Sequence, residues 1–183
     1  MKKAILIFVV ALAILPVAFS RAETGAVTLL ISGDGDESTL YISLSPDGRE
    51  YVIFSSKPLE VGGNICSHPE EAPNELLCKA TAIAGFEVNA GGGSDHVTFT
   101  SDIPVPVTMR GGPGIDHLTG GGASDKILGG PDTDYLVGRR GDDWILGGPG
   151  ADRLVGGPGD DQLRGGPEKD KIIGGPGRNE VVP

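Results

Sequence analysis

The chain has 183 residues and is acidic, with 25 Asp and Glu against 15 Lys and Arg and a formal net charge of −10 at pH 7. This excess of acidic groups argues against nucleic acid or an anionic membrane surface as a partner. Aromatic residues make up 5% of the chain whereas glycine contributes 31 residues, so the composition favours a thin repetitive fold over a conventional globular core.

Residues 1–22 have the features of a secretion signal. Two lysines precede a sixteen-residue apolar run, 4–19, and Ser20-Arg21-Ala22 has the small-x-small pattern of a cleavage site. We therefore expect a secreted, extracellular protein whose mature chain begins at Glu23. A retained membrane anchor is the alternative, although the apolar run is short for a membrane span.

Residues 23–80 are expected to form a short N-terminal β-strand region. Residues 27–31, 40–44 and 50–54 have strand-like patterns, and the Pro-Asp-Gly turn at 46–48 predicts a hairpin between the last two. The acidic loop 32–38 begins like an EF-hand, but Thr39 stands where that loop needs glycine. An exposed turn is the favoured interpretation of this loop.

Cys66 and Cys78 are the only two cysteines of the chain. In an exported protein such a pair predicts a disulfide, here one that closes an acidic loop. A reactive or metal-binding pair is the alternative, but two cysteines with His68 are too few ligands for zinc.

Residues 81–110 have the features of an irregular first coil that caps a repeat array. Residues 83–88 predict a strand, and 90–98 form a degenerate repeat with Asp95 and Val97 at its characteristic positions. Pro104 and Pro106 do not suit a central strand, so 99–110 is expected to form a wider coil or an edge.

From Gly111 to Val182 a nine-residue unit recurs eight times without a gap. Position 1 is always glycine, position 2 is glycine except at Arg139, and position 8 is always aliphatic. Position 6 is aspartate in seven units and asparagine in the last: Asp116, Asp125, Asp134, Asp143, Asp152, Asp161, Asp170 and Asn179. A fixed short period of this kind predicts a solenoid.

Each unit predicts a glycine-rich turn followed by a strand of three residues. Neighbouring strand residues point to opposite faces, so position 8 should lie inside and positions 7 and 9 outside. Two units then make one coil, and coils stack in parallel about 4.8 Å apart. Positions two units apart therefore align in columns, one with Asp116, Asp134, Asp152 and Asp170, the other with Asp125, Asp143, Asp161 and Asn179.

The repeat resembles the RTX, or haemolysin-type, calcium-binding nonapeptide family, whose pattern is G-G-x-G-x-D-x-U-x. The units that begin at Gly111, Gly147 and Gly156 match this pattern in full, and the others depart at one or two positions. The resemblance implies an all-β fold, with a right-handed parallel β-roll of two sheets over residues 111–183. It also implies several Ca²⁺ ions as the bound cofactor.

The spacing itself gives a reason for calcium. Carboxylates about 5 Å apart repel by about 1 kcal/mol in water and about 3 kcal/mol at an effective dielectric of 20. Ca²⁺ takes six to eight oxygen ligands, which carboxylates from successive coils and turn carbonyls can supply. The predicted metal ligands are the seven position-6 aspartates, with Asp95 and Asn179 as weaker ones. Aspartate as a simple turn former is the alternative.

These observations predict a secreted calcium-binding protein that is not an enzyme. Neither H-E-x-x-H nor G-x-S-x-G occurs in the sequence. A calcium-stiffened adhesion or matrix protein that uses a flat sheet face is an alternative, because aliphatic residues recur at position 9 beside Tyr135 and Trp144. An accessory module of a secreted hydrolase and self-association through strand edges are further alternatives.

Overall fold

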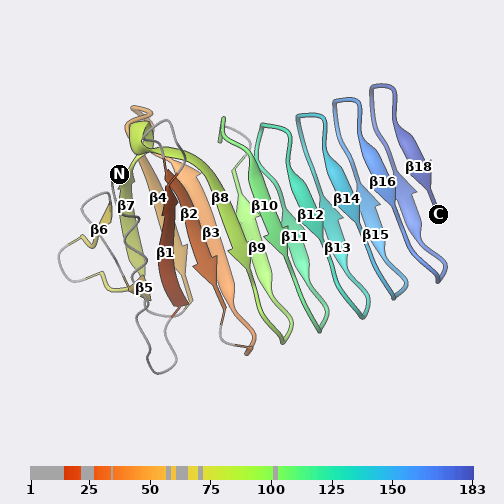
Figure 1. The fold of residues 1–183 in the computed structure, drawn as a ribbon, viewed down its shortest axis with the longest axis horizontal. Coiled ribbons are helices and arrows are strands. Elements are labelled where there is room, and N and C mark those ends of the chain that lie inside the picture. Colours follow the sequence, from red (N-terminus) through yellow and green to blue (C-terminus); the bar gives the residue numbers. More distant parts are fainter. Residues whose placement is uncertain are drawn as a thin grey trace, which may run out of the picture.

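The computed structural model describes residues 15–21, 27–33, 35–56, 59–60, 66–69, 72–100 and 103–183. Within these residues the chain is all-β, a parallel solenoid with two nine-stranded sheets and a single 3-10 turn at Ala80–Ala82 (Figure 1). The fold class expected from the sequence is confirmed. Among the described residues no helix is long and apolar enough to cross a membrane.

Each of the eight nonapeptide units contributes one strand of three residues. Sheet I receives β12 (Lys126–Leu128), β14 (Trp144–Leu146), β16 (Gln162–Arg164) and β18 (Glu180–Val182). Sheet II receives β11 (His117–Thr119), β13 (Tyr135–Val137), β15 (Arg153–Val155) and β17 (Lys171–Ile173). Among these eight strands, every pair of neighbours within a sheet is parallel and shifted by two units, as for Leu136 opposite Leu154.

Residues 83–110 continue this parallel stacking. β8 (Ile83–Asn89) and β10 (Val107–Arg110) lie in sheet I, and β9 (His96–Phe99) lies in sheet II. β10 pairs with β8 on one side and with β12 on the other. β10 is therefore a central strand of sheet I. Pro104 and Pro106 lie before it, in a widened turn, so they do not interrupt the pairing of the strand.

The solenoid extends one coil further toward the N-terminus than the sequence indicated. β2 (Val27–Ser32) is parallel to β8, and β3 (Thr39–Leu44) is parallel to β9. Between them, the loop predicted as an exposed turn stacks on the turn at 90–95, and a Cβ added at Gly93 would lie 2.6 Å from the backbone nitrogen of Glu37. Asp34 of this loop lies outside the described residues.

Antiparallel strands cover the N-terminal end of the solenoid. The predicted hairpin is confirmed, since β3 pairs with β4 (Glu50–Ser55), which then pairs with β7 (Glu75–Lys79). The predicted disulfide joins Cys66 to Cys78, between β6 (Cys66–Ser67) and β7. β1 (Leu15–Arg21) is antiparallel to β2 and parallel to β5 (Leu59–Glu60).

The strand β1 lies within the segment expected to be a secretion signal. Residues 1–14 and 22–26 of that region lie outside the described residues. Cleavage after Ala22 remains a prediction.

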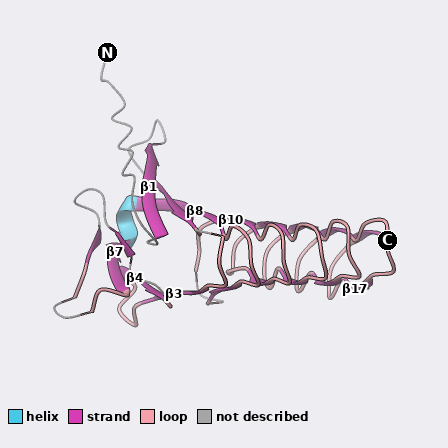
Figure 2. Cartoon of the chain, turned by 90° about the horizontal axis from the view of Figure 1, so that it is seen from below, coloured by secondary structure: helices cyan, strands magenta, loops and turns pink. Residues whose placement is uncertain are grey.

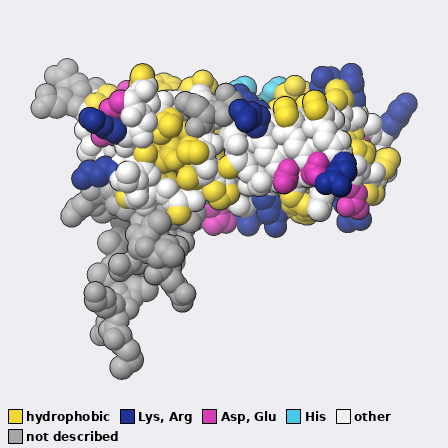
Figure 3. All heavy atoms as spheres, turned by 90° about the horizontal axis from the view of Figure 1, so that it is seen from above, with side chains coloured by type: hydrophobic (Ala, Val, Ile, Leu, Met, Phe, Trp, Pro, Cys, Tyr) yellow, Lys and Arg dark blue, Asp and Glu magenta, His cyan; other side chains and the backbone are white. Residues whose placement is uncertain are grey.

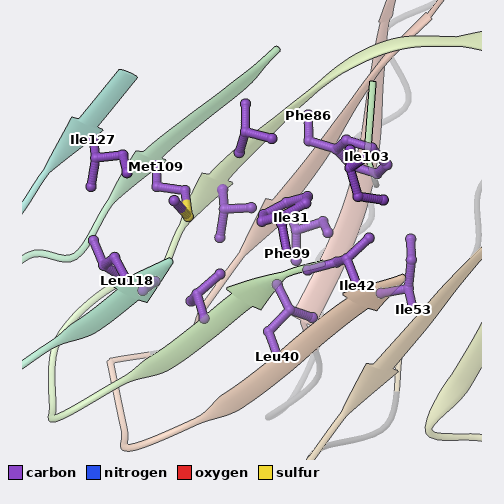
Figure 4. Packing of buried hydrophobic residues seen from close by; sticks show 14 of the residues in the cluster. Ile31, Leu40, Ile42, Ile53, Phe86, Phe99, Ile103, Met109, Leu118 and Ile127 are labelled. Atoms are coloured by element: carbon purple, nitrogen blue, oxygen red, sulfur yellow. The ribbon is translucent and has the colours of Figure 1, made fainter. Parts of the chain in front are cut away.

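The core is a narrow layer between the two sheets (Figures 2 and 4). Position-8 side chains such as Leu118, Ile127 and Leu136 are fully buried, whereas positions 7 and 9 are partly or fully exposed. At the N-terminal end, Phe86 packs edge-on against Tyr51 and Phe99, with ring centroids 5.0 and 5.1 Å apart. One aliphatic residue per half-coil therefore fills the roll, and aromatic rings fill its wider beginning.

Two rows of turns connect the sheets. We name the turns 90–95, 111–116, 129–134, 147–152 and 165–170, which lead from sheet I to sheet II, the outgoing turns. The turns 120–125, 138–143, 156–161 and 174–179 lead back and are named the return turns. In Figure 3 much of the visible face of the roll is white, which marks the backbone and side chains that are neither hydrophobic, charged nor His, and acidic and basic groups lie together near its C-terminal end.

Candidate metal centre

The position-6 residues form the two predicted columns, one in each row of turns. In the outgoing row, the backbone N–H of Asp116 donates to Oδ1 of Asp134, and that of Asp134 donates to Oδ1 of Asp152, both at 2.8 Å. In the return row, Asp125 donates to Asp143 at 2.8 Å, and Asp143 to Asp161 at 2.9 Å. One oxygen of each carboxylate therefore holds the preceding coil by a charge-assisted hydrogen bond.

The outgoing column reaches beyond the nonapeptide array at its N-terminal end. Asp95 donates its backbone N–H to Oδ1 of Asp116, and its own Oδ1 accepts both the N–H and the hydroxyl of Ser38, at 2.8 and 2.7 Å. Sequence reasoning missed Ser38. Its signal is weak but present, because Gly33 and Leu40 stand at the position-1 and position-8 spacings from it.

The second carboxylate oxygen, Oδ2, defines the candidate site. Among the described residues, six position-6 aspartates bury this atom without a hydrogen-bond donor: Asp116, Asp134, Asp143, Asp152, Asp161 and Asp170. A buried, unpaired oxygen of a carboxylate costs several kcal/mol unless a positively charged group neutralises it. The same unpaired oxygen recurs in six turns, so it is a feature of the repeat rather than an isolated irregularity.

Position-1 glycines are required because Oδ2 lies against them. A Cβ added at Gly129 would collide with Oδ2 of Asp134 and would lie 2.8 Å from the carbonyl oxygen of Gly147. That same class of carbonyl accepts one N–H from the preceding coil, as when Gly130 donates to Gly147 at 3.0 Å. Because a carbonyl oxygen has two lone pairs, each keeps acceptor capacity for a cation.

Burial weakens the acidity of these carboxyl groups. Desolvation raises the pKa of Asp116 and Asp125 from 3.8 to about 6, and that of Asp134 and Asp143 to about 7. Neighbouring carboxylates of the same column add to the rise for Asp134, whereas the backbone hydrogen bond from Asp116 opposes it. The columns therefore hold charge poorly without a compensating cation.

Departures from the motif at position 4 also add oxygen acceptors at the rim of the outgoing turns. Asp132 accepts the N–H of Gly114 at 3.2 Å, and Glu168 accepts that of Gly150 at 3.0 Å. Asp132 also holds a positive φ of 81°, a conformation that favours glycine. These side chains tie successive coils together outside the buried columns.

The comparison with protein families matches these repeats to a known group. The model of the RTX calcium-binding nonapeptide repeat, which contains four copies of the unit, matches residues 110–145 and again residues 146–181. Residues 110–181 belong to the RTX calcium-binding nonapeptide repeat family. Searches of curated proteins and of solved structures found no match to the chain.

The chemistry of the turns fits the ion that the RTX family binds. Carboxylate and carbonyl oxygens are the hard ligands that Ca²⁺ prefers. At Gly111, Gly129, Gly147 and Gly156 an added Cβ would meet both an Oδ2 atom and the carbonyl oxygen of the following coil. The described residues contain no group of three or more His, Cys, Asp or Glu side chains that gathers at one point. Calcium bound in these turns would supply positive charge beside the buried Oδ2 atoms.

Two histidines of sheet II lie away from these turns. His96 and His117 project from sheet II and stack with ring centroids 5.7 Å apart. The RTX repeats form a structural calcium-binding roll, and these outward histidines are not part of its turns.

Proposed function

We propose that the protein is a secreted calcium-binding β-roll whose position-6 aspartates hold structural Ca²⁺ in both rows of turns, and that it is not an enzyme. The observation that carries the proposal is the set of six buried Oδ2 atoms without a donor among the described residues. Each lies against the position-1 glycine of its turn, and a carbonyl oxygen of the following coil lies close to that glycine in the turns of Asp116, Asp134, Asp152 and Asp161.

In this proposal the aspartates have two separate tasks. Oδ1 accepts a backbone N–H and sets the register between coils whether or not calcium is present. Oδ2 contributes to calcium binding, so that the ion neutralises the column and its binding free energy adds to the free energy of unfolding. From the range of dissociation constants found for extracellular calcium-binding modules, we expect a Kd of about 10⁻⁴ to 10⁻³ M.

The proposal is tested by replacing Asp134 and Asp152 with alanine together. Isothermal titration calorimetry with Ca²⁺ should show fewer bound ions per chain than in the wild type. A charge-matched control replaces two exposed carboxylates outside the turns, Asp47 and Glu87, with alanine and should leave the number of ions unchanged. Equal stoichiometry in the wild type and the Asp134/Asp152 variant would refute this assignment of ligands.

Two exposed aromatic residues favour a second candidate function, adhesion by a calcium-stiffened surface. Tyr41 and Phe54 are directly paired across β3 and β4 and are 46% and 49% exposed. Flat, exposed apolar groups of this kind are typical of interaction surfaces. Capture of a surface partner in calcium but not in chelator, lost in a Tyr41→Ser, Phe54→Ser variant, would support this candidate.

A further inference from the structure

The last return turn, 174–179, has asparagine where the other regular turns have aspartate. Oδ1 of Asn179 accepts the backbone N–H of Asp161 at 2.9 Å, as an aspartate would. Its amide nitrogen Nδ2 donates to the carbonyl oxygen of Gly175, also at 2.9 Å. The two partners fix the orientation of the amide, because only the oxygen can accept the N–H.

The amide nitrogen of Asn179 occupies the place that Oδ2 has in the other turns. A Cβ added at Gly174 would lie 2.6 Å from Nδ2, just as a Cβ at Gly156 would meet Oδ2 of Asp161. Where Asp161 presents an unpaired oxygen that needs a cation, Asn179 presents a hydrogen-bond donor with a partner within its own turn. The Nδ2–H group of Asn179 therefore takes the place of a cation in this turn.

The first return turn, 120–125, is also closed by the protein. Oδ1 of Asp125 accepts the N–H of Val107 at 2.8 Å, and its Oδ2 accepts the N–H of Gly121 at 2.7 Å. In the next turn the equivalent N–H, that of Arg139, donates instead to Gly156 of the following coil at 2.8 Å. Both oxygens of Asp125 are thus engaged by backbone groups.

Additional contacts fix this first turn to the segment before it. Gly122 donates its N–H to the carbonyl oxygen of Ile103 at 3.0 Å, and the guanidinium of Arg139 donates to the carbonyl oxygen of Phe99. Arg139 lies in the second return turn, so the departure from glycine at position 2 joins that turn to the end of β9. The N-terminal end of the return row is therefore held by protein groups.

We propose that the two end turns of the return row are closed by hydrogen bonds in place of calcium, and that this row binds calcium through its interior aspartates, Asp143 and Asp161. The inference rests on the proposed calcium function and makes it asymmetric between the two rows. Asn179 is then a calcium-independent cap of the roll, rather than a weakened member of a calcium site.

The first test converts the cap into a calcium turn with Asn179→Asp. Calorimetric titration with Ca²⁺ should show about one additional ion per chain, because a carboxylate replaces the amide donor. In chelator the melting temperature should fall by about 2–4 °C, because the bond to Gly175 is lost and two oxygens then face each other. An unchanged number of ions would overturn the inference.

The second test places an amide in an interior return turn with Asp161→Asn, and Asp161→Ala is the matched control. Both variants should bind fewer ions than the wild type. Asp161→Asn should keep or raise the wild-type melting temperature in chelator, because its amide can donate within the turn, whereas Asp161→Ala should lower it. An equal fall in both variants would contradict the substitution of calcium by an amide.

The two proposals fail in different ways. If the wild-type protein binds no Ca²⁺, the proposed function and the cap both fall. If the wild type binds Ca²⁺ but Asn179→Asp binds the same number of ions, only the cap is wrong.

Discussion

The ion-free protein should lose stability as the pH rises, which is opposite to the behaviour of most proteins with buried carboxylates in ion pairs. The pKa of Asp134 and Asp143 in the folded protein is about 7, and that of Asp116 and Asp125 about 6, against an ordinary value of 3.8. Between about pH 4 and pH 7 the folded state therefore holds protons that the unfolded state has already released. The free energy of unfolding falls with pH across that window.

The size of the effect follows from these pKa values. Between pH 5 and pH 8, a group with a folded pKa of about 7 lowers the free energy of unfolding by about 2.6 kcal/mol, and one with a folded pKa of about 6 lowers it by about 1.4 kcal/mol. The four groups together give about 8 kcal/mol, which we halve to about 4 kcal/mol because solvent near the turns screens the charges. Since a typical domain has about 5–15 kcal/mol in total, the ion-free roll should be close to unfolding at pH 8.

Urea unfolding in metal-free buffer at pH 5, 6, 7 and 8 measures this effect directly. The free energy of unfolding should decrease along the series, and Asp134→Asn with Asp143→Asn should remove more than half of the decrease. In saturating calcium the trend should reverse, because the ion binds the deprotonated carboxylates. A free energy of unfolding that stays constant or rises from pH 5 to pH 8 without metal would refute the reasoning.

Two further predictions concern the core and the disulfide. Leu136→Ala removes a fully buried side chain and should lower the free energy of unfolding in saturating calcium by about 2–5 kcal/mol. The control Ile173→Ala, at a side chain that is 42% exposed, should cost about 0.5 kcal/mol or less by the same urea titration. Cys66→Ser with Cys78→Ser should lower the free energy of unfolding by about 3 kcal/mol. It should leave the number of calcium ions found by calorimetry unchanged, because β6 is the edge strand at the other end of sheet II from the RTX strand β17.

The regular part of the fold could be predicted because each physical requirement leaves its own mark in the nonapeptide. A buried position needs an aliphatic residue, the turn needs glycine, and the column needs an acceptor. Leu136 and Asp134 therefore lie where their positions in the unit predicted. The hairpin at 46–48 and the pair Cys66–Cys78 were equally local signals.

The first coil could not be found in the same way. In the sequence, the antiparallel strands stand between β3 and β8, so the fixed nine-residue period is interrupted there. The residue at the top of the outgoing column, Ser38, only donates to Asp95 and needs no carboxylate of its own. Parallel backbone pairing, rather than a sequence motif, places this coil on the roll.

The sequence also could not predict which partner each of the two oxygens of a carboxylate has. Alignment of Asp125 with Asp143 predicted a column of equivalent groups. The structure shows that Oδ2 of Asp125 accepts the N–H of Gly121, whereas Oδ2 of Asp143 has no donor within the described part of the chain. That difference depends on the direction of one peptide group in a glycine-rich turn, and glycine permits more than one direction.

The central claim is that calcium at the buried Oδ2 atoms holds the coils of the roll together. Far-ultraviolet circular dichroism of the protein at pH 8, titrated with Ca²⁺ from chelator to millimolar concentration, tests it most directly. The β-sheet signal and the melting temperature should both increase as the turns fill. A β-sheet spectrum and a melting temperature that are the same in chelator and in saturating calcium would contradict the claim.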